Sequence, residues 1–233
     1  MPLELRRIVD STDSAIASFG TLQEATYFEP EMLIPASFIG QMLQWSDSSR
    51  SNHLIVLEDA GRVVAGTLFH YLSKPQIGFS SYLAVTADLR GQGLARRLHD
   101  ARTALLEEVS DGSCQGVLID VVNPARLSAD ELELERGVGS DPVNRLRVFS
   151  SLGFKRVDIV YEQPVGGANG GPVINMDLLF SPREPIDSVP TALIVAAMLT
   201  FWTPWLGRKT AQTAARLLEA RADGDELALI ALV

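Results

Sequence analysis

The sequence contains a single cysteine, Cys114, so the chain cannot form an internal disulfide. No basic and then apolar leader precedes Leu3-Glu4-Leu5, and we therefore expect a cytoplasmic, reducing setting. Positive charge is also scarce, because 20 Lys and Arg residues stand against 29 Asp and Glu residues, a formal net charge of −9. This deficit argues against a nucleic-acid binder held by phosphate contacts and favours an acidic enzyme that suits a cationic substrate.

Long uncharged runs are absent except for one stretch, residues 188–207. A run of about twenty such residues can cross a bilayer, but Pro190 and Pro204 interrupt this one. Residues 191–203 remain for an unbroken helix, a length typical of a buried helix in a globular domain. We therefore expect no membrane contact, and the 46% hydrophobic and 21% charged residues predict a chain that buries a substantial core.

Hydrophobic periodicity predicts an α/β (α+β) chain of strands and helices. Strands are expected over residues 3–9, 53–58, 62–71, 78–85, 117–122, 154–161 and 173–180, and helices over 14–28, 36–45, 94–109 and 143–152. The last two strands are expected to pair. The acidic stretch 123–142, with Glu131, Glu133 and Glu135, is expected to lie at the surface around a short solvated helix.

Three prolines between residues 182 and 190 mark the best boundary in the chain. We predict a domain over residues 1–182 and a helical C-terminal extension over 183–233, with one helix apolar all round and a second, amphipathic helix over 209–222. Trp202 and Trp205 resemble interface anchors, so a homodimer through this extension is expected. The alternative is that the extension caps the core of a monomer.

The most informative stretch is Arg90-Gly91-Gln92-Gly93-Leu94-Ala95, between a predicted strand and a predicted helix. Glycines let consecutive backbone N–H groups point into one concave nest, and the helix start adds its positive dipole end, which together suit a pyrophosphate. The stretch lacks the Lys and the spacing of a P-loop and lacks the third Gly of a Rossmann fingerprint. A plain glycine turn between strand and helix is the remaining alternative.

The run from Leu83 to Leu98 resembles motif A of the GNAT superfamily, the acyl-CoA-dependent N-acyltransferases, in which Arg90, Gly93 and Ala95 fill Arg/Gln-x-x-Gly-x-Gly/Ala. Downstream, Phe149-Ser150-Ser151-Leu152-Gly153-Phe154 is similar to the family's motif B, Tyr-x-x-Leu-Gly-Phe. The resemblance covers about residues 3–180 and implies a mixed, mostly antiparallel twisted sheet flanked by helices. It implies acetyl-CoA as the cofactor and transfer of an acyl group to a primary amine by direct attack in a ternary complex.

The same resemblance implies a cofactor site on motif A, where the strand backbone pairs with the pantetheine arm and the turn amides hold the pyrophosphate. A strand N–H near Leu83 or Val85 would polarise the thioester carbonyl. The expected cofactor-binding residues are Leu83, Ala84, Val85, Arg90, Gly91, Gln92, Gly93, Leu94, Ala95, Arg96, Asn123 and Phe149. For Asn123, capping of the polar loop is an equal alternative.

Phe149 stands where the family commonly has a Tyr that protonates the departing thiolate, so the general acid is open. Tyr161 is a candidate donor, although a packed aromatic is the simpler interpretation. Asp120, alone in an apolar strand, is the first candidate base, with an ion pair to Arg145 or Arg147 as the alternative. Glu29 is the next candidate.

Other candidate residues give weaker evidence of a function. Glu31, like Glu29, is expected either to face the acceptor or to be a solvated loop carboxylate. His70 and His99 have no ligand partners at metal-binding spacing, so we expect no metal site. Cys114 has no identifiable His partner, which weakens a covalent mechanism. Two functions therefore remain: an N-acetyltransferase, and a GNAT-like sensor that binds acyl-CoA without turnover.

Overall fold

A computed structural model describes residues 3–27, 33–45, 47–165 and 170–232. The strands are β1 (Glu4–Ile8), β2 (Arg50–Asp59), β3 (Arg62–Leu72), β4 (Ile77–Val85), β5 (Gly116–Val122), β6 (Lys155–Val157), β7 (Met176–Pro182), β8 (Ser188–Pro190) and β9 (Glu226–Ile230). The helices are α1 (Ser14–Thr26), α2 (Ala36–Gln44), α3 (Leu94–Val109), α4 (Ala129–Gly137), α5 (Pro142–Ser151), α6 (Thr191–Leu206) and α7 (Arg208–Glu219). The predicted class, a mixed α/β chain with a mostly antiparallel sheet, is confirmed.

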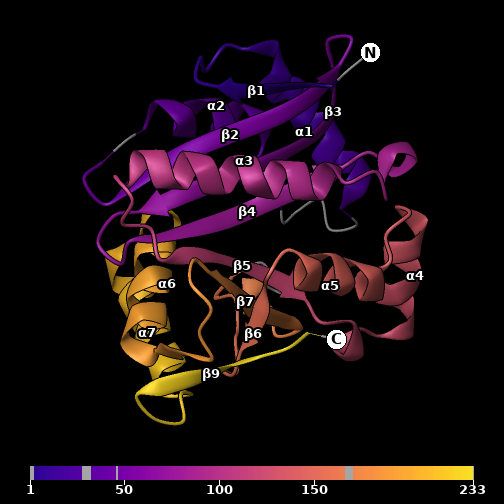
Figure 1. Cartoon of the computed structure of the whole chain (residues 1–233). Coiled ribbons are helices and arrows are strands. Elements are labelled where there is room, and N and C mark those ends of the chain that lie inside the picture. The colour runs from indigo at the N-terminus through magenta and orange to yellow at the C-terminus, as the bar shows by residue number, and fades with distance from the viewer. Residues whose placement is uncertain (1–2, 28–32, 46, 166–169, 233) are drawn as a thin grey trace.

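All these strands join one sheet in the order β1-β2-β3-β4-β5-β7-β6-β9-β8 (Figure 1). Each neighbouring pair is antiparallel except β4 and β5, which run parallel. That parallel contact is short, because only Gly78 and Phe79 pair with Val117 and Leu118 before the two strands separate. The separation leaves an opening in the middle of the sheet.

A bulge in β4 lies beside this opening. Across β3, Leu68 pairs with Tyr82 while Phe69 pairs with Ser80, so Ser81 has no partner opposite it. An extra residue bends a strand and changes which side chains face one side. The bulge therefore lets Tyr82 and Ser81 both reach the face of the sheet that carries the cavity described below.

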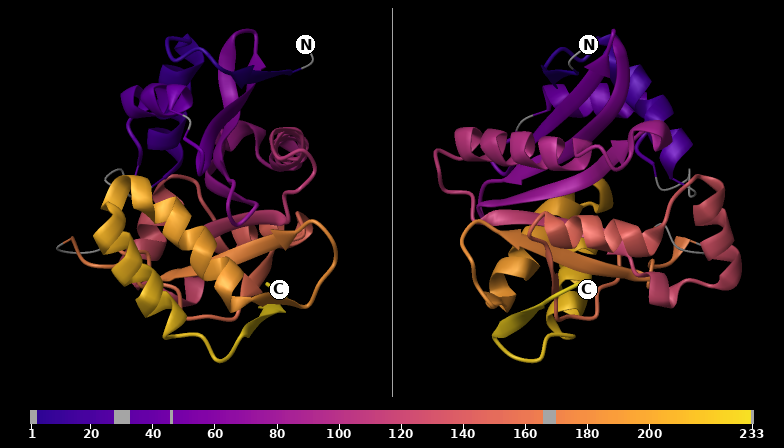
Figure 2. Two further views of the ribbon diagram at one scale, coloured as in Figure 1. Left: turned by 90° about the vertical axis from the view of Figure 1, so that its left-hand side faces the viewer. Right: turned by 45° about the vertical axis from the view of Figure 1, so that its right-hand side comes forward.

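The helices cover both faces of the sheet. Figure 2 shows α3 on one face, whereas α1, α2, α6 and α7 lie on the other. Helix α3 packs Leu98 and Leu106 against strands β2 to β4, as its predicted spacing requires. Helices α1 and α2 share a separate apolar cluster with β1 to β4, around Phe19 and Ile39.

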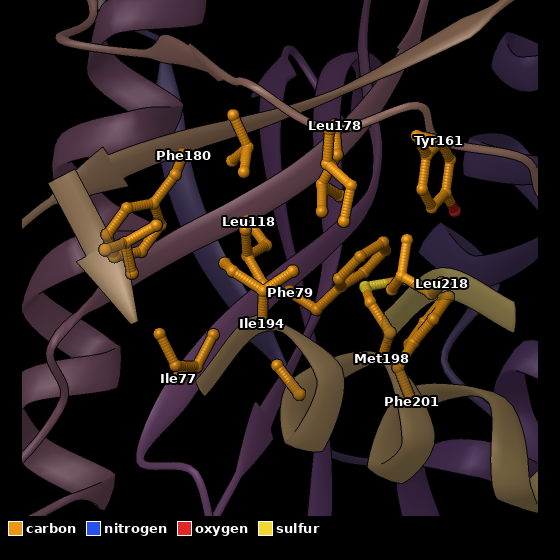
Figure 3. Packing of buried hydrophobic residues seen from close by; sticks show 14 of the residues in the cluster. Ile77, Phe79, Leu118, Tyr161, Leu178, Phe180, Ile194, Met198, Phe201 and Leu218 are labelled. Atoms are coloured by element: carbon orange, nitrogen blue, oxygen red, sulfur yellow. The ribbon is translucent and has the colours of Figure 1, made fainter. Parts of the chain in front are cut away.

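The C-terminal segment shares the core of the sheet, with α6 turning Ile194, Met198 and Phe201 toward Phe79 and Leu118 (Figure 3). The segment is not purely helical as predicted, because β9 pairs with β6 and with β8. The division of the chain at residue 182 stays a prediction.

The interpretation of Pro204 as a helix end was wrong. Helix α6 includes Pro204 and continues to Leu206. A proline removes one N–H from the helical ladder and crowds the preceding turn, yet the helix continues, and the Gly207 N–H donates to the Thr203 carbonyl at 3.1 Å. Gly207 then ends the helix with a φ of 75°, a conformation that glycine adopts freely. The predicted strand 154–161 is likewise shortened to β6, Lys155–Val157.

Candidate functional site

The turn between β4 and α3 forms an open backbone cradle. Gly91 and Gly93 both have a φ of 78°, and a Cβ placed on either would meet no atom within 4 Å in the described structure. Gly93 caps α3, and the first backbone bond into that helix is from the Arg97 N–H to the Gly93 carbonyl at 3.0 Å. The N–H groups of residues 94–96 precede that bond and have no acceptor within the helix. Free amides at a positive helix end, with open space before them, suit a phosphate group.

Strand β4 presents a second set of backbone groups to the opening beside β5. The Thr86 N–H donates to the Val64 carbonyl on β3, so Thr86 faces β3. Because backbone groups alternate sides along a strand, those of Val85 and Leu83 face away from β3, toward the opening. Ala84 faces β3 instead, where it pairs with Gly66. Of the three strand residues expected to hold a pantetheine arm, Leu83 and Val85 therefore have backbone groups that face the opening, whereas Ala84 does not.

A cavity of about 910 Å³ begins at this opening. It extends on the α1, α2 and α6 face of the sheet, with Leu83 and Phe149 at one end and residues of α6 and α7 at the other. Phe149 is 6% exposed and stacks edge-on against Phe154, with ring centroids 5.4 Å apart. The cavity therefore connects the motif A strand to the C-terminal helices.

Asp120 is partly buried on β5 and lines this cavity. The Tyr161 hydroxyl donates a hydrogen bond to its Oδ2 atom at 2.9 Å. Burial raises the pKa of Asp120, while the bond from Tyr161 lowers it. Tyr161 is 1% exposed, and burial raises the pKa of its phenol well above 10. Two of the three predicted catalytic residues thus form one hydrogen-bonded pair.

Asp120 does not form the ion pair with Arg145 that was the alternative to its role as a base; Glu135 forms that pair instead. Arg145 on α5 donates from Nη2 to Oε1 of Glu135 on α4 at 2.6 Å. Glu135 is 1% exposed, so its expected surface position was wrong. Arg145, on the next helix, neutralises the buried charge of Glu135. Both side chains line the cavity near Asp120.

Two tyrosines near Asp120 were missed at the sequence level. The Tyr27 hydroxyl donates to the Leu83 carbonyl at 3.3 Å, and the Tyr82 hydroxyl accepts from the Ile34 N–H at 3.1 Å. Their rings meet edge-on with centroids 5.6 Å apart. Burial raises the pKa of Tyr27 to about 12 and also raises that of Tyr82, so both stay neutral at physiological pH. The aromatic character of the motif A strand was the only available signal for Tyr82.

The remaining predicted residues lie apart from Asp120. Asn123 donates to Asp177 Oδ2 at 2.8 Å and accepts from the Ala125 N–H at 2.9 Å. The second bond is the loop cap that was the alternative to cofactor binding. Arg90 and Arg96, on the cradle, donate to the backbone carbonyls of Gly139 and Ser151. Gln92, Leu94 and Ala95 belong to the same turn and helix start. Glu29 and Glu31 lie outside the described residues.

Within the described residues, no group of three or more His, Cys, Asp or Glu side chains is arranged to hold a metal ion. None of the described helices has the length and apolar character needed to span a membrane.

The chain is similar to known acetyltransferases. The sequence model of the acetyltransferase (GNAT) family matches residues 17–131, about half of the chain and including the whole cradle. No curated protein matches the chain in sequence.

Solved structures share the fold at low identity. Ard1 from Thermoplasma volcanium is 15% identical with a TM-score of 0.53, and the match covers 79% of this chain and all of that one. PaiA N-acetyltransferase from Thermoplasma acidophilum, solved with coenzyme A, is 7% identical with a TM-score of 0.50, over 78% and 99% of the two chains. With the matched family model and the motif A cradle, this fold places the chain in the GNAT superfamily of acyl-CoA-dependent N-acyltransferases.

Proposed function

We propose that the protein transfers an acetyl group from acetyl-CoA to a primary amine by direct attack, with both substrates bound together. The observation that carries this proposal is that a single cavity joins the open edge of β4 at Leu83 to the buried carboxylate of Asp120. The cradle at Gly91 and Gly93 fits a pyrophosphate, and the groups of Leu83 and Val85 that face the opening fit the amides of a pantetheine arm. When bound, acetyl-CoA supplies an activated thioester.

Asp120 is the proposed base. An amine reaches the cavity as an ammonium and must lose a proton before it can attack a thioester. Asp47, Asp120 and Glu135 are the described acids that line the cavity, and Glu135 is held by Arg145. Hydrogen bonds from Ser49 lower the pKa of Asp47, which makes it a weaker base, so Asp120 is the better candidate. Burial moves its pKa upward, closer to the range of a useful base. Tyr161 acts as a positioning residue, because its proton is held between two oxygens in a buried bond.

The departing thiolate needs no dedicated acid in this proposal. Phe149 has no proton to donate, and a thiol with a pKa near 8.5 is a good leaving group. Protonation by water is sufficient for such a group.

The proposed cofactor site is tested by calorimetric titration with acetyl-CoA and with CoA on Gly93→Asp. An aspartate there places a carboxylate where the phosphates would bind. Gly61→Asp is the matched control, because Gly61 has a φ of 82° and equally open surroundings but lies in the β2–β3 turn. We expect the wild type and Gly61→Asp to bind at micromolar levels and Gly93→Asp to lose binding. Equal binding by both variants would remove the cradle from the cofactor site.

A sensor that binds acyl-CoA without turnover is the second candidate, favoured by Phe149 at the position of the family's usual acid. Asp120→Asn separates the two. The transferase proposal expects this variant to bind acetyl-CoA normally and to lose thiol release with amines. A wild type that binds acetyl-CoA and releases no thiol with any amine would support the sensor.

A cytoplasmic setting and a homodimer stay predictions. Trp202 is 1% exposed inside the chain's own core, so Trp205, at 41%, is the remaining candidate anchor of the pair. Leu217 on α7 is a second exposed apolar residue of the C-terminal segment. Light scattering on the wild type and on Leu217→Glu measures the mass, and a monomeric mass in both would exclude the dimer.

A further inference from the structure

The far end of the cavity contains a buried cation without a counter-ion. Arg50 begins β2, is 7% exposed and lines the cavity. Its guanidinium donates to neutral groups: Nε to Asn52 Oδ1 at 2.8 Å and Nη1 to the Phe201 carbonyl at 3.2 Å. Nη2 lies 3.1 Å from Nε2 of His70. Within the described residues no carboxylate lies within 4 Å of the guanidinium.

Arg50 has no direct ion-pair partner, and Asp47 compensates its charge only from beyond 4 Å. Burial and the nearby guanidinium lower the pKa of His70 well below 6.5, so His70 is neutral. Asp47 is the nearest acid to act on Arg50, but its carboxylate accepts bonds from Ser49 and from the Arg50 backbone N–H. Burial lowers the pKa of Arg50 to about 10, which still leaves it charged at neutral pH. A buried cation of this kind is costly unless an anion joins it.

Two more cations gather at the same end. Lys74, in the β3–β4 turn, and Arg208, at the start of α7, are exposed side chains on the cavity wall. Three cations and one acid, Asp47, line this end of the cavity, so it is locally positive in a chain with nine more acids than bases. The opposite end carries Asp120, so the cavity is negative near the motif A strand and positive near α6 and α7.

Between these ends the cavity wall is largely apolar. The side chains that form it are Phe38, Met42 and Trp45 from α2 and its end, Phe79 from β4, and Phe201 and Trp205 from α6. Phe79 and Phe201 stack with ring centroids 3.7 Å apart, which anchors α6 to the sheet. A ligand that fills the cavity must therefore carry an apolar body between two polar ends.

The distances suit a small molecule. His70 Nε2 lies 2.7 Å from the Ser81 hydroxyl, so this histidine links the guanidinium to the bulge of β4. Leu83 follows two residues later, which is about 7 Å along a strand. The cationic end and the edge of β4 are thus separated by about the length of a short ω-amino acid.

We propose that the acceptor is an amine that also carries a carboxylate, with an apolar body between them, and that Arg50 binds the carboxylate while the amine lies toward Asp120. This inference rests on the proposed transferase function and names its substrate class. A guanidinium recognises a carboxylate through two parallel hydrogen bonds. Lys74 and Arg208 attract the same group from the rim.

The test compares matched pairs of amines that differ in the carboxylate: 4-(aminomethyl)benzoate against benzylamine, and 6-aminohexanoate against hexylamine. Thiol release from acetyl-CoA gives kcat/KM for each. We expect the wild type to prefer the carboxylate member of at least one pair by tenfold or more, and Arg50→Gln to lose this preference while still using the plain amine. Equal kcat/KM within both pairs would overturn the inference and leave the transferase intact.

Because Arg50 also holds the Phe201 carbonyl, its loss can disturb α6, and a rim variant avoids this. Arg208→Glu should raise KM for the carboxylate amines several-fold and leave the plain amines unchanged. Arg216→Glu is the control, since Arg216 is an exposed residue of the same helix α7 that does not line the cavity. Equal effects of the two variants would count against a carboxylate site.

A binding measurement separates this inference from the transferase itself. Calorimetric titration with 4-(acetamidomethyl)benzoate and 6-acetamidohexanoate, against the corresponding amides, requires no turnover. Binding of an acid and not of its amide, lost in Arg50→Gln, supports the anion site even if no amine is acetylated. Equal binding of acid and amide, or none, contradicts it.

Discussion

The hydrogen bond from Tyr161 to Asp120 leads to a prediction about the pH dependence of activity. Tyr161→Phe removes only the hydroxyl that donates to Asp120 at 2.9 Å. The ring keeps its stacked position against Trp202, with centroids 6.4 Å apart and planes 19° apart. The variant therefore changes the electrostatics of Asp120 with little change in packing.

The size and direction of the effect follow from this one bond. Burial raises the pKa of Asp120, and the Tyr161 bond opposes that rise by stabilising the carboxylate. A hydrogen bond to a charged group contributes about 1.5–3 kcal/mol, and one pKa unit corresponds to about 1.4 kcal/mol. Loss of the bond should raise the pKa of Asp120 by about 1–2 units. A base works in its ionised form, so activity is lost as pH falls through this pKa, and the acidic limb should move to higher pH.

The assay is the pH profile of kcat/KM for thiol release with one fixed amine. Tyr71→Phe is the matched control, because Tyr71 is a buried tyrosine whose hydroxyl lies 3.1 Å from Ser113 Oγ, outside the cavity. We expect the limb of this control to coincide with that of the wild type. An unmoved limb in Tyr161→Phe, or one that moves to lower pH, would refute the role of Asp120 as the titrating base.

Two further predictions concern stability, measured by urea unfolding. Glu135→Ala leaves Arg145 without its buried partner and should destabilise the fold by about 3 kcal/mol, whereas Glu133→Ala, in an exposed pair, should change it by less than about 0.5 kcal/mol. Trp202→Ala removes a side chain that is 1% exposed and should cost about 3–5 kcal/mol, while Trp205→Ala, at 41% exposure, should cost much less. Similar losses of stability for the two glutamate variants, or for the two tryptophan variants, would contradict the burial of Glu135 or of Trp202.

Much of the fold could be predicted because its signals are local. The apolar spacing of residues 94–109 matches α3 at both ends, and the gap between the predicted strands 53–58 and 62–71 contains the turn between β2 and β3. Strand β9 was missed although Leu227 and Leu229 are buried and alternate with polar or small residues. Its five residues are too few for alternation alone to separate a strand from a helix end.

The candidate site could be predicted only in part. The glycine turn of motif A carries its conformation in its own residues, so its position was visible in the sequence. The position of Glu135 was not visible, because the sequence does not distinguish it from the two neighbouring acids of the same segment. Only the fold brings Glu135 against Arg145 on a separate helix. Arg50 reaches the cavity through contacts with Phe201, 151 residues away, and no local pattern encodes such a meeting.

The packing of α6 against the sheet has a consequence during protein synthesis. Strands β5 and β7 present Leu118, Leu178 and Phe180 to a face that only the later elements α6, α7 and β9 cover. At a translation rate of about 5–20 residues per second, the stretch 191–230 takes about 2–8 s to make. Over that interval the nascent chain exposes a broad apolar surface, which stays open to non-native contacts until the last strand leaves the ribosome.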